Sequence, residues 1–326
     1  MPIYSAHLSL TTIYIVTESL IGATAVLGNT LVIWAVRLNP ALQDATFYFV
    51  VSLAIADFAV GVLVMPLAII LNMEIQMHFH VCLFVCCSII ILTNASILSL
   101  LAISIDRYLR IRIPIRYRSV VRKKRIFICI LFSWILSALG ALLPVFGWNH
   151  RSNLEENERD YLRCEFIKVM SLDFLVYFCF FGWVVIPLFL MVGLYTQIFY
   201  LIQKNRRHNI SIHQGKQNYY SKEHRTASSL ALVMFLFALC WLPISIVNCI
   251  SYFYPSVAEN STFQPVVLLT ILLSHANSAM NPIVYAFKIR KFKYTFLSII
   301  NKHILCKADV NESCSIDLTL ENVIPK

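Results

Sequence analysis

Seven long apolar runs constrain the fold of this chain more than any other feature of its sequence. Each run is long enough to cross the roughly 30 Å hydrocarbon core of a bilayer as a helix. Charged residues make up 13% of the chain, against about 25% in soluble domains. The sequence therefore predicts an all-α membrane protein built as a bundle of seven transmembrane helices. The runs lie near residues 13–36, 47–71, 82–111, 126–148, 172–202, 227–253 and 263–287.

Four of these runs contain an interior proline, which a soluble helix would tolerate poorly. In a membrane bundle, neighbouring helices and water can satisfy the carbonyl group that a proline leaves without its donor. We therefore expect kinked helices at these positions. The four residues are Pro66, Pro187, Pro243 and Pro282.

The distribution of basic side chains predicts the orientation of the bundle. One side keeps four of the 27 Lys and Arg residues, so the other side collects 23 (27 − 4). By the positive-inside rule, we expect an extracellular N-terminus and a cytosolic C-terminus in a multi-pass protein of the plasma membrane. The cytosolic surface then suits anionic lipid headgroups and an acidic protein partner, and no nucleic acid partner is expected. The four outer basic residues are Arg151, Arg159, Arg163 and Lys168.

Cysteine positions predict one disulfide. Six of the ten cysteines lie inside apolar runs, where an unpaired thiol behaves as a small hydrophobic group. Only Cys82 and Cys164 fall near the outer surface, so they are the one plausible oxidised pair. This bond would tie the start of the third span to the loop before the fifth.

A buried carboxylate in the second run predicts an ion or ligand site. Asp57 lies at mid-membrane depth, where a charge is expensive unless the bundle interior provides partners. Ser96, Asn277 and Asn281 are its expected neighbours, and neutral oxygens around one carboxylate suit a small hard cation. Sodium is the natural candidate for an allosteric ion. A structural hydrogen-bond knot around a protonated or water-bridged Asp57 stays open as the alternative.

The segment after the seventh run predicts a short amphipathic eighth helix over residues 288–301 on the cytosolic side. It has Phe292 and Phe296 on one face and basic residues elsewhere, as for a helix lying on the inner leaflet. Residues 1–303 then form one seven-span membrane domain with its eighth helix, and residues 304–326 form a flexible cytosolic tail. Cys306 is the expected palmitoylation site, with a free thiol as the alternative. Asn260 is the one sequon expected to be accessible for glycosylation.

Short motifs in consecutive runs resemble the rhodopsin-like G-protein-coupled receptors. Each motif alone is weak, but the set appears in order along the chain. It consists of Gly28-Asn29, Leu53–Asp57, Asp106-Arg107-Tyr108, Trp134, Pro187, Cys240–Pro243 and Asn281–Tyr285.

Longer stretches narrow the resemblance to the adenosine receptors. Subtypes one and three, which couple to inhibitory G proteins and lower adenylate cyclase activity, are the most similar. Ser245 and the pair Ser274-His275 match subtype three, whereas GNTLVIWAVR and IPIRY are closer to subtype one. The chain therefore resembles subtype three, with subtype one as the alternative and a receptor for another small ligand as a more remote one. The stretches include FYFVVSLAIAD, ASILSLLAISIDRYLRI, RCEFIKV and LLSHANSAMNPIVYAFKIRKF.

The resemblance implies an adenosine site. Phe166 is expected to stack on the purine, and Asn248 to bond the adenine edge through its amide. Ser274 and His275 are expected to contact the ribose hydroxyls, with Thr93 opposite. The other expected contacts are Ile89, Leu175, Trp241, Ile244, Ile271 and Glu18, the last of these fixing the tautomer of the histidine.

The resemblance also implies signalling without catalysis. Agonist contacts are expected to favour a bundle packing with an open cytosolic cleft. Pro243 would let the lower sixth span swing, and Asp106 would release Arg107 to an inhibitory heterotrimeric G protein. Tyr285 would rearrange beneath Asn281.

Three further features belong to this expected switch. Tyr108 and Pro282 complete its motifs, and Glu223 lies near the foot of the sixth span. A contact between Glu223 and Arg107 stays open. Arrestin and receptor kinases are expected as additional cytosolic partners.

Other classes of protein lack their sequence signatures here. The chain has no Cys-x-x-Cys ladder, His-Glu-x-x-His motif or glycine-rich phosphate loop, so neither an enzyme nor a cofactor is expected. A transporter would need repeated halves with a charged or broken-helix path. An opsin would need a lysine in the seventh run, and residues 263–287 contain none.

Overall fold

The computed structural model describes residues 2–73, 75–154, 156, 159–209, 214–258 and 263–304. Within these ranges, seven apolar helices are long enough to cross a membrane. The predicted all-α class and seven-helix bundle are therefore confirmed. The predicted modification sites Asn260 and Cys306, and all but the first residue of the predicted tail, lie outside the described residues.

The seven spans are formed by single helices or by helices joined through π-helical segments. The second span joins α2, a π-helical segment and α3, and the fifth joins a π-helical segment and α8. The bounds are α1 Pro2–Leu38, α2 Ala45–Ala59, π Val60–Val64, α3 Met65–Asn72, α4 Phe79–Arg112, α6 Lys123–Ala141, π Phe174–Val185, α8 Ile186–Asn209, α9 Gln214–Phe253 and α11 Phe263–Lys288.

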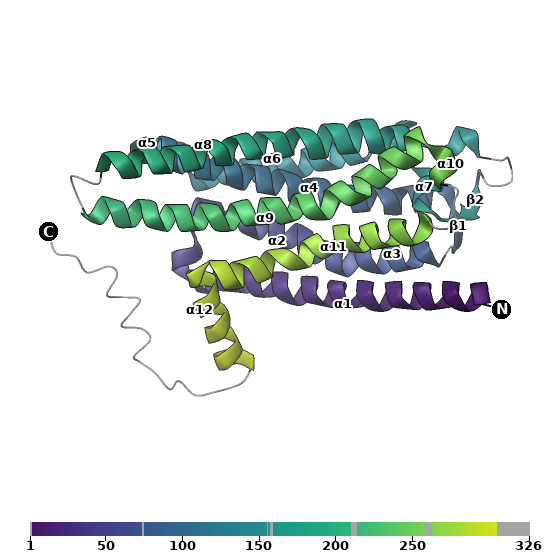
Figure 1. Ribbon diagram of the computed structural model, residues 1–326, viewed down its shortest axis with the longest axis horizontal. Helices are drawn as coiled ribbons and strands as arrows, with labels where there is room; N and C mark the ends of the chain where they lie inside the picture. Colours follow the sequence, from purple (N-terminus) through teal and green to yellow (C-terminus); the bar gives the residue numbers. More distant parts are fainter. Residues whose placement is uncertain are drawn as a thin grey trace.

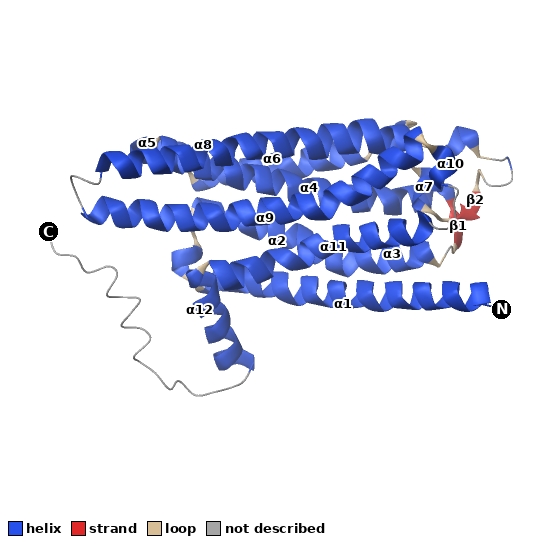
Figure 2. Ribbon diagram, viewed as in Figure 1, coloured by secondary structure: helices blue, strands red, loops and turns tan. Residues whose placement is uncertain are grey.

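Shorter elements close the two ends of the bundle (Figures 1 and 2). The strands lie at one end, called here the strand end, together with the start of α1. The helix α12 turns away from the bundle axis at the opposite end, called the α12 end. The short elements are β1 Gln76–His78, α5 Pro114–Val120, β2 Tyr161–Arg163, α7 Phe166–Val169, α10 Pro255–Ala258 and α12 Arg290–Ile299, which a π turn extends to Ile304.

The helix α4 occupies the centre of the bundle. It contacts α2, α6, α8 and α9, whereas α1 packs against α2 and α11, and α11 packs against α9. A side chain that points inward from α4 can therefore reach several of the other spans, and functional residues on this helix have partners on several sides.

Two of the predicted proline distortions take the form of π-helical segments. Pro66 follows the segment Val60–Val64 closely, and Pro187 follows Phe174–Val185. Proline lacks an N–H and its ring clashes with the carbonyl four residues earlier, and the wider π turn relieves both constraints. Pro243 and Pro282 instead lie inside continuous α-helices, α9 and α11.

The helices differ from the predicted boundaries at several ends. The fourth span stops at Ala141 rather than near residue 148. Pro144 cannot donate to the carbonyl of residue 140, so the chain continues as a 3-10 turn, Leu143–Phe146, and then reverses at Gly147 with φ of 120°. Conversely, α9 begins at Gln214, before the apolar run at 227, because polar residues extend the helix beyond the part that hydropathy detects.

At the strand end, β1 and β2 pair antiparallel and form a small sheet. Met77 lies opposite Leu162 in this ladder. Cys82 at the start of α4 forms the predicted disulfide with Cys164, just after β2, with 5.7 Å between their Cα atoms. The sheet and the disulfide together fix the loop that leads directly to Phe166.

Candidate functional site

Five of the predicted ligand residues line one cavity between the helices. Ile89 and Thr93 come from α4, Trp241 from α9, and Ser274 and His275 from α11. The space open to a water-sized molecule is about 10 Å³, close to the minimum that one water needs. The helices are thus closely packed here, and a larger ligand must displace side chains to enter.

A contact between α1 and α11 fixes the orientation of His275. Glu18 is fully buried, and its Oε1 lies 2.5 Å from Nδ1 of His275. An ionised carboxylate can only accept a hydrogen bond, so Nδ1 carries the hydrogen in this arrangement. The other ring nitrogen, Nε2, is then left for a ligand.

The remaining predicted ligand residues are not among those that line this cavity. Phe166 and Leu175 pack in the apolar cluster beneath the disulfide. Asn248 is half-buried on α9, two helical turns from Trp241, while Ile244 lies between them. A further predicted contact, Ile271, accepts a hydrogen bond at its carbonyl from the Ser274 hydroxyl, at 2.7 Å.

Asp57 is fully buried and joins three spans through hydrogen bonds. Ser96 of α4 donates to Oδ1 at 3.1 Å, and Asn281 of α11 donates through Nδ2 to Oδ2 at 2.7 Å. Each carboxylate oxygen therefore faces a donor, and two of the three predicted neighbours of Asp57 contact it directly. Within the described residues, no cluster of three or more His, Cys, Asp or Glu side chains could hold a metal.

The Asp57 region shares the ligand cavity. Ser96, Asn277 and Ser278 line it together with Thr93 and His275. Asn29 of α1 stabilises the same place by donating to the Ser278 carbonyl at 2.9 Å. A change of packing at one part of this cavity therefore reaches the other part directly.

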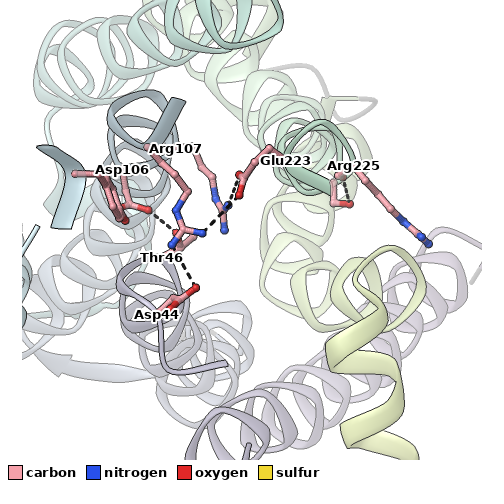
Figure 3. A network of polar contacts seen from close by, with 9 residues as sticks. Asp44, Thr46, Asp106, Arg107, Glu223 and Arg225 are labelled. Carbon is pink, nitrogen blue, oxygen red and sulfur yellow. Dashed lines mark hydrogen bonds and ion pairs between the residues drawn. The ribbon is translucent and has the colours of Figure 1, made fainter. Parts of the chain in front are cut away.

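Near the α12 end, Asp106 bonds to groups that sequence analysis did not identify (Figure 3). Thr46 of α2 donates to Oδ2, and the Tyr117 hydroxyl of α5 donates to Oδ1 at 2.7 Å. Burial raises the pKa of the Tyr117 phenol, and the nearby Asp106 carboxylate raises it further. Tyr117 therefore stays a neutral donor throughout the physiological pH range.

Arg107 pairs with α9 rather than with its neighbour Asp106, which corrects the predicted arrangement. Its Nη1 donates to Oε2 of Glu223 at 3.2 Å, and both side chains are almost fully buried. Arg110 lies 3.7 Å from Oε1 of the same carboxylate and donates to Asp44 at 3.2 Å. The contact between Glu223 and Arg107 that the sequence left open is thus present, with a second arginine beside it.

The remaining switch residues lie close by. Tyr285 is 1% exposed and stacks on Phe292 of α12, with 5.4 Å between ring centroids. Tyr108 is half-buried against the main apolar cluster. The eighth helix therefore contacts the seventh span through the tyrosine that is expected to rearrange.

The whole sequence is similar to known membrane receptors. The seven-transmembrane receptor (rhodopsin family) model matches residues 28–285. Adenosine receptor A3 of Ovis aries and that of Bos taurus are each 49% identical over 322 residues, which is 98% of this chain and 100% of each relative. Adenosine receptor A3 of Canis lupus familiaris is 50% identical over 309 residues, 94% of this chain and 96% of the relative. The chain belongs to the adenosine receptor family.

As a member of this family, the protein is a signalling receptor and not an enzyme. Sequence reasoning identified Asp106 and Arg107 in this receptor but missed two partners of Asp106 and two residues of the neighbouring ion pairs. The sequence did suggest Glu223 as a partner of Arg107, because it is an acidic residue near the cytosolic end of the sixth span. Nothing in the sequence pointed to the four missed residues, since they become neighbours only through the fold. They are Asp44, Thr46, Arg110 and Tyr117.

We predict that Glu223→Gln loosens the α12 end of this receptor. The substitution removes the charge that Arg107 and Arg110 share, so the free energy of unfolding should fall by about 1–3 kcal/mol. Thermal unfolding in detergent measures this change, and spin labels on the ends of α4 and α9 should move apart. Glu165→Gln, which breaks a half-exposed pair with Lys168 at 2.8 Å, is the control. An equal effect of both substitutions would contradict the prediction.

Proposed function

We propose that this protein is a plasma-membrane receptor for extracellular adenosine that couples to an inhibitory heterotrimeric G protein. The single observation that carries the proposal is the shared cavity that Thr93, Ser274 and His275 line together with Trp241. Two hydroxyl groups and an imidazole suit the hydroxyls of a ribose. The similarity to three A3 receptors favours subtype three over subtype one.

The orientation of the ligand follows from the tautomer of His275. Glu18 holds Nδ1, so Nε2 can accept a hydrogen bond from a ribose hydroxyl. The ribose would then lie deep in the bundle, and the adenine would lie nearer the strand end, with Phe166 against its face and Asn248 against its edge. Since the cavity is small, adenosine binding must separate the helices that line it.

Binding is then coupled to the α12 end through a change of packing. An agonist shifts the population toward a conformation that it contacts better. In that conformation α9 swings about Pro243, Glu223 leaves Arg107, and the freed arginine contacts the G protein. The N-terminus is extracellular and the C-terminus cytosolic. Arrestin and receptor kinases would be further cytosolic partners, with Asn260 glycosylated and Cys306 palmitoylated.

Adenosine should lower cyclic AMP in transfected cells whose adenylate cyclase has been stimulated by forskolin. The reason is that an inhibitory G protein reduces cyclase activity, and pertussis toxin should abolish the response. Untransfected cells treated in parallel control for endogenous receptors. A cyclic AMP level that adenosine does not change would refute the proposed ligand, and a toxin-resistant response would refute the proposed coupling.

Two substitutions should separate the adenine and ribose contacts. Asn248→Ala should weaken agonists and ribose-free antagonists alike, by about 1–3 kcal/mol, because the adenine edge loses its partner. His275→Ala should weaken nucleoside agonists more than ribose-free antagonists. Radioligand competition on membranes measures both effects. If the two variants share one profile across the ligand set, the proposed orientation is wrong.

Sodium should oppose agonist binding through Asp57. We propose that an ion replaces the donors around this carboxylate in a more open packing that agonists disfavour. The coupling should be about 1–3 kcal/mol, and it must be reciprocal. Agonist competition in sodium chloride, compared with choline chloride at equal concentration, measures it. Asp57→Asn should remove the sodium effect while ligand binding persists. An effect of equal size in that variant would leave Asp57 as a hydrogen-bond knot only.

A further inference from the structure

Two histidines at the strand end stand apart from the ligand site. His78 ends β1, and His80 lies in the first turn of α4. Their rings are stacked, with 5.4 Å between centroids and 27° between planes. Neither residue lines the ligand cavity or takes part in the contacts around Asp106, so the function proposed above assigns them no role.

His78 is the N-cap of α4. Its backbone is extended, and its Nδ1 accepts a hydrogen bond from the backbone N–H of His80 at 3.3 Å. The first amide groups of a helix have no partner within the helix, and a cap residue supplies one. This cap needs a free lone pair on Nδ1, and a protonated imidazole has none. Protonation of His78 therefore removes the cap.

His80 faces a cation. Its Nε2 lies 3.4 Å from Nη1 of Arg151. A guanidinium can only donate, so the histidine nitrogen must accept and its ring must be neutral. Arg151 also bonds to Asp160 at 3.2 Å and lies over the Phe79 ring. Protonation of His80 would break the contact and place a second positive charge beside Arg151.

The groups that surround the two rings are positive, neutral or already paired. The N-terminus of α4 carries the positive end of the helix dipole, and the stacked rings would repel each other if both were charged. On β2, the ring of Tyr161 contacts that of His78 at nearly a right angle, and Arg163 lies two pairs further along the ladder. The nearby acids are already paired, Asp160 with Arg151 and Glu165 with Lys168.

The same short stretch positions the loop that carries Phe166. His78 pairs with Tyr161 in the ladder, the backbone N–H of Phe79 donates to the Asp160 carbonyl at 2.9 Å, and Cys82 is disulfide-bonded one turn later. Losing the cap of α4 would loosen all three attachments. Phe166, the proposed purine contact, lies two residues after the disulfide.

We propose that His78 and His80 form an extracellular proton-sensing site that weakens ligand binding when the surrounding medium becomes acidic. The capped arrangement requires neutral rings, so it is stable near neutral pH and is lost as both rings take up protons. Acidification then lowers ligand affinity through the loop and not through direct contact. The effect on affinity rests on the proposed adenosine site, and the loss of the cap does not.

The test compares the wild-type receptor with the double substitution His78→Asn and His80→Gln. Asn caps a helix well and Gln can accept from Arg151, so both hydrogen bonds persist but neither residue titrates. Adenosine-competitive radioligand affinity should fall about five-fold or more between pH 7.4 and pH 5.5 in the wild type. The double variant should show a clearly smaller fall. His275 is unchanged in both proteins, so the comparison isolates the contribution of His78 and His80.

A measurement without ligand separates this proposal from the proposed function. Hydrogen exchange of the purified receptor, corrected for the intrinsic pH dependence of amide exchange, should show faster exchange at residues 78–84 at pH 5.5 in the wild type but not in the double variant. His150→Asn, in the neighbouring loop, is the matched control and should behave as the wild type. Equal exchange in wild type and double variant would overturn the proton-sensing site. Faster exchange with unchanged affinity would overturn its coupling to the ligand.

Discussion

A carboxylate inside a bilayer must find its partners within the protein, because no water is available in the hydrocarbon to solvate it. Among the described residues, Glu18, Asp57, Asp106 and Glu223 are carboxylates buried in the protein, and each has partners on other helices. Glu18 ties α1 to α11, and Asp57 ties the second span to α4 and α11. Asp106 ties α4 to α2 and α5, and Glu223 ties α9 to α4. Lipid-facing apolar packing alone would not select one arrangement of the helices, whereas these contacts do.

The four carboxylates also explain why a change at one depth of the bundle reaches another. Asp57 and the proposed ribose contacts share a cavity, and both involve α11. Further along α11, Tyr285 stacks on Phe292 of α12. A displacement of α11 by a ligand would therefore alter its contacts with Glu18 and Asp57. It would also alter the packing of α11 against the eighth helix, α12. No separate pathway is needed, since one helix carries all three sets of contacts.

Much of the fold was predictable because it depends on local sequence. Seven apolar runs and the disulfide required only hydropathy, charge and the positions of two outer cysteines. The end of the fourth span at Ala141 and the π-helical segments before Pro66 and Pro187 were not predicted, since hydropathy does not report which carbonyl each amide reaches. The hydrogen bonds of Asp106 could not be predicted from the sequence either. Tyr117 follows it by 11 residues, and only the fold of the intervening chain brings its hydroxyl back.

The double attachment of Arg110 bears on how quickly the α12 end can close again. In the proposed movement of α9, Arg110 would lose Glu223 but could keep Asp44 and its position over the Tyr117 ring, 5.1 Å from the centroid. Its guanidinium is therefore still oriented when the carboxylate returns, and little side-chain entropy has to be lost a second time. On this proposal the α12 end would close again without a rotamer search by Arg110. The lifetime of the open conformation would then be governed by what occupies the cleft, rather than by the arginine.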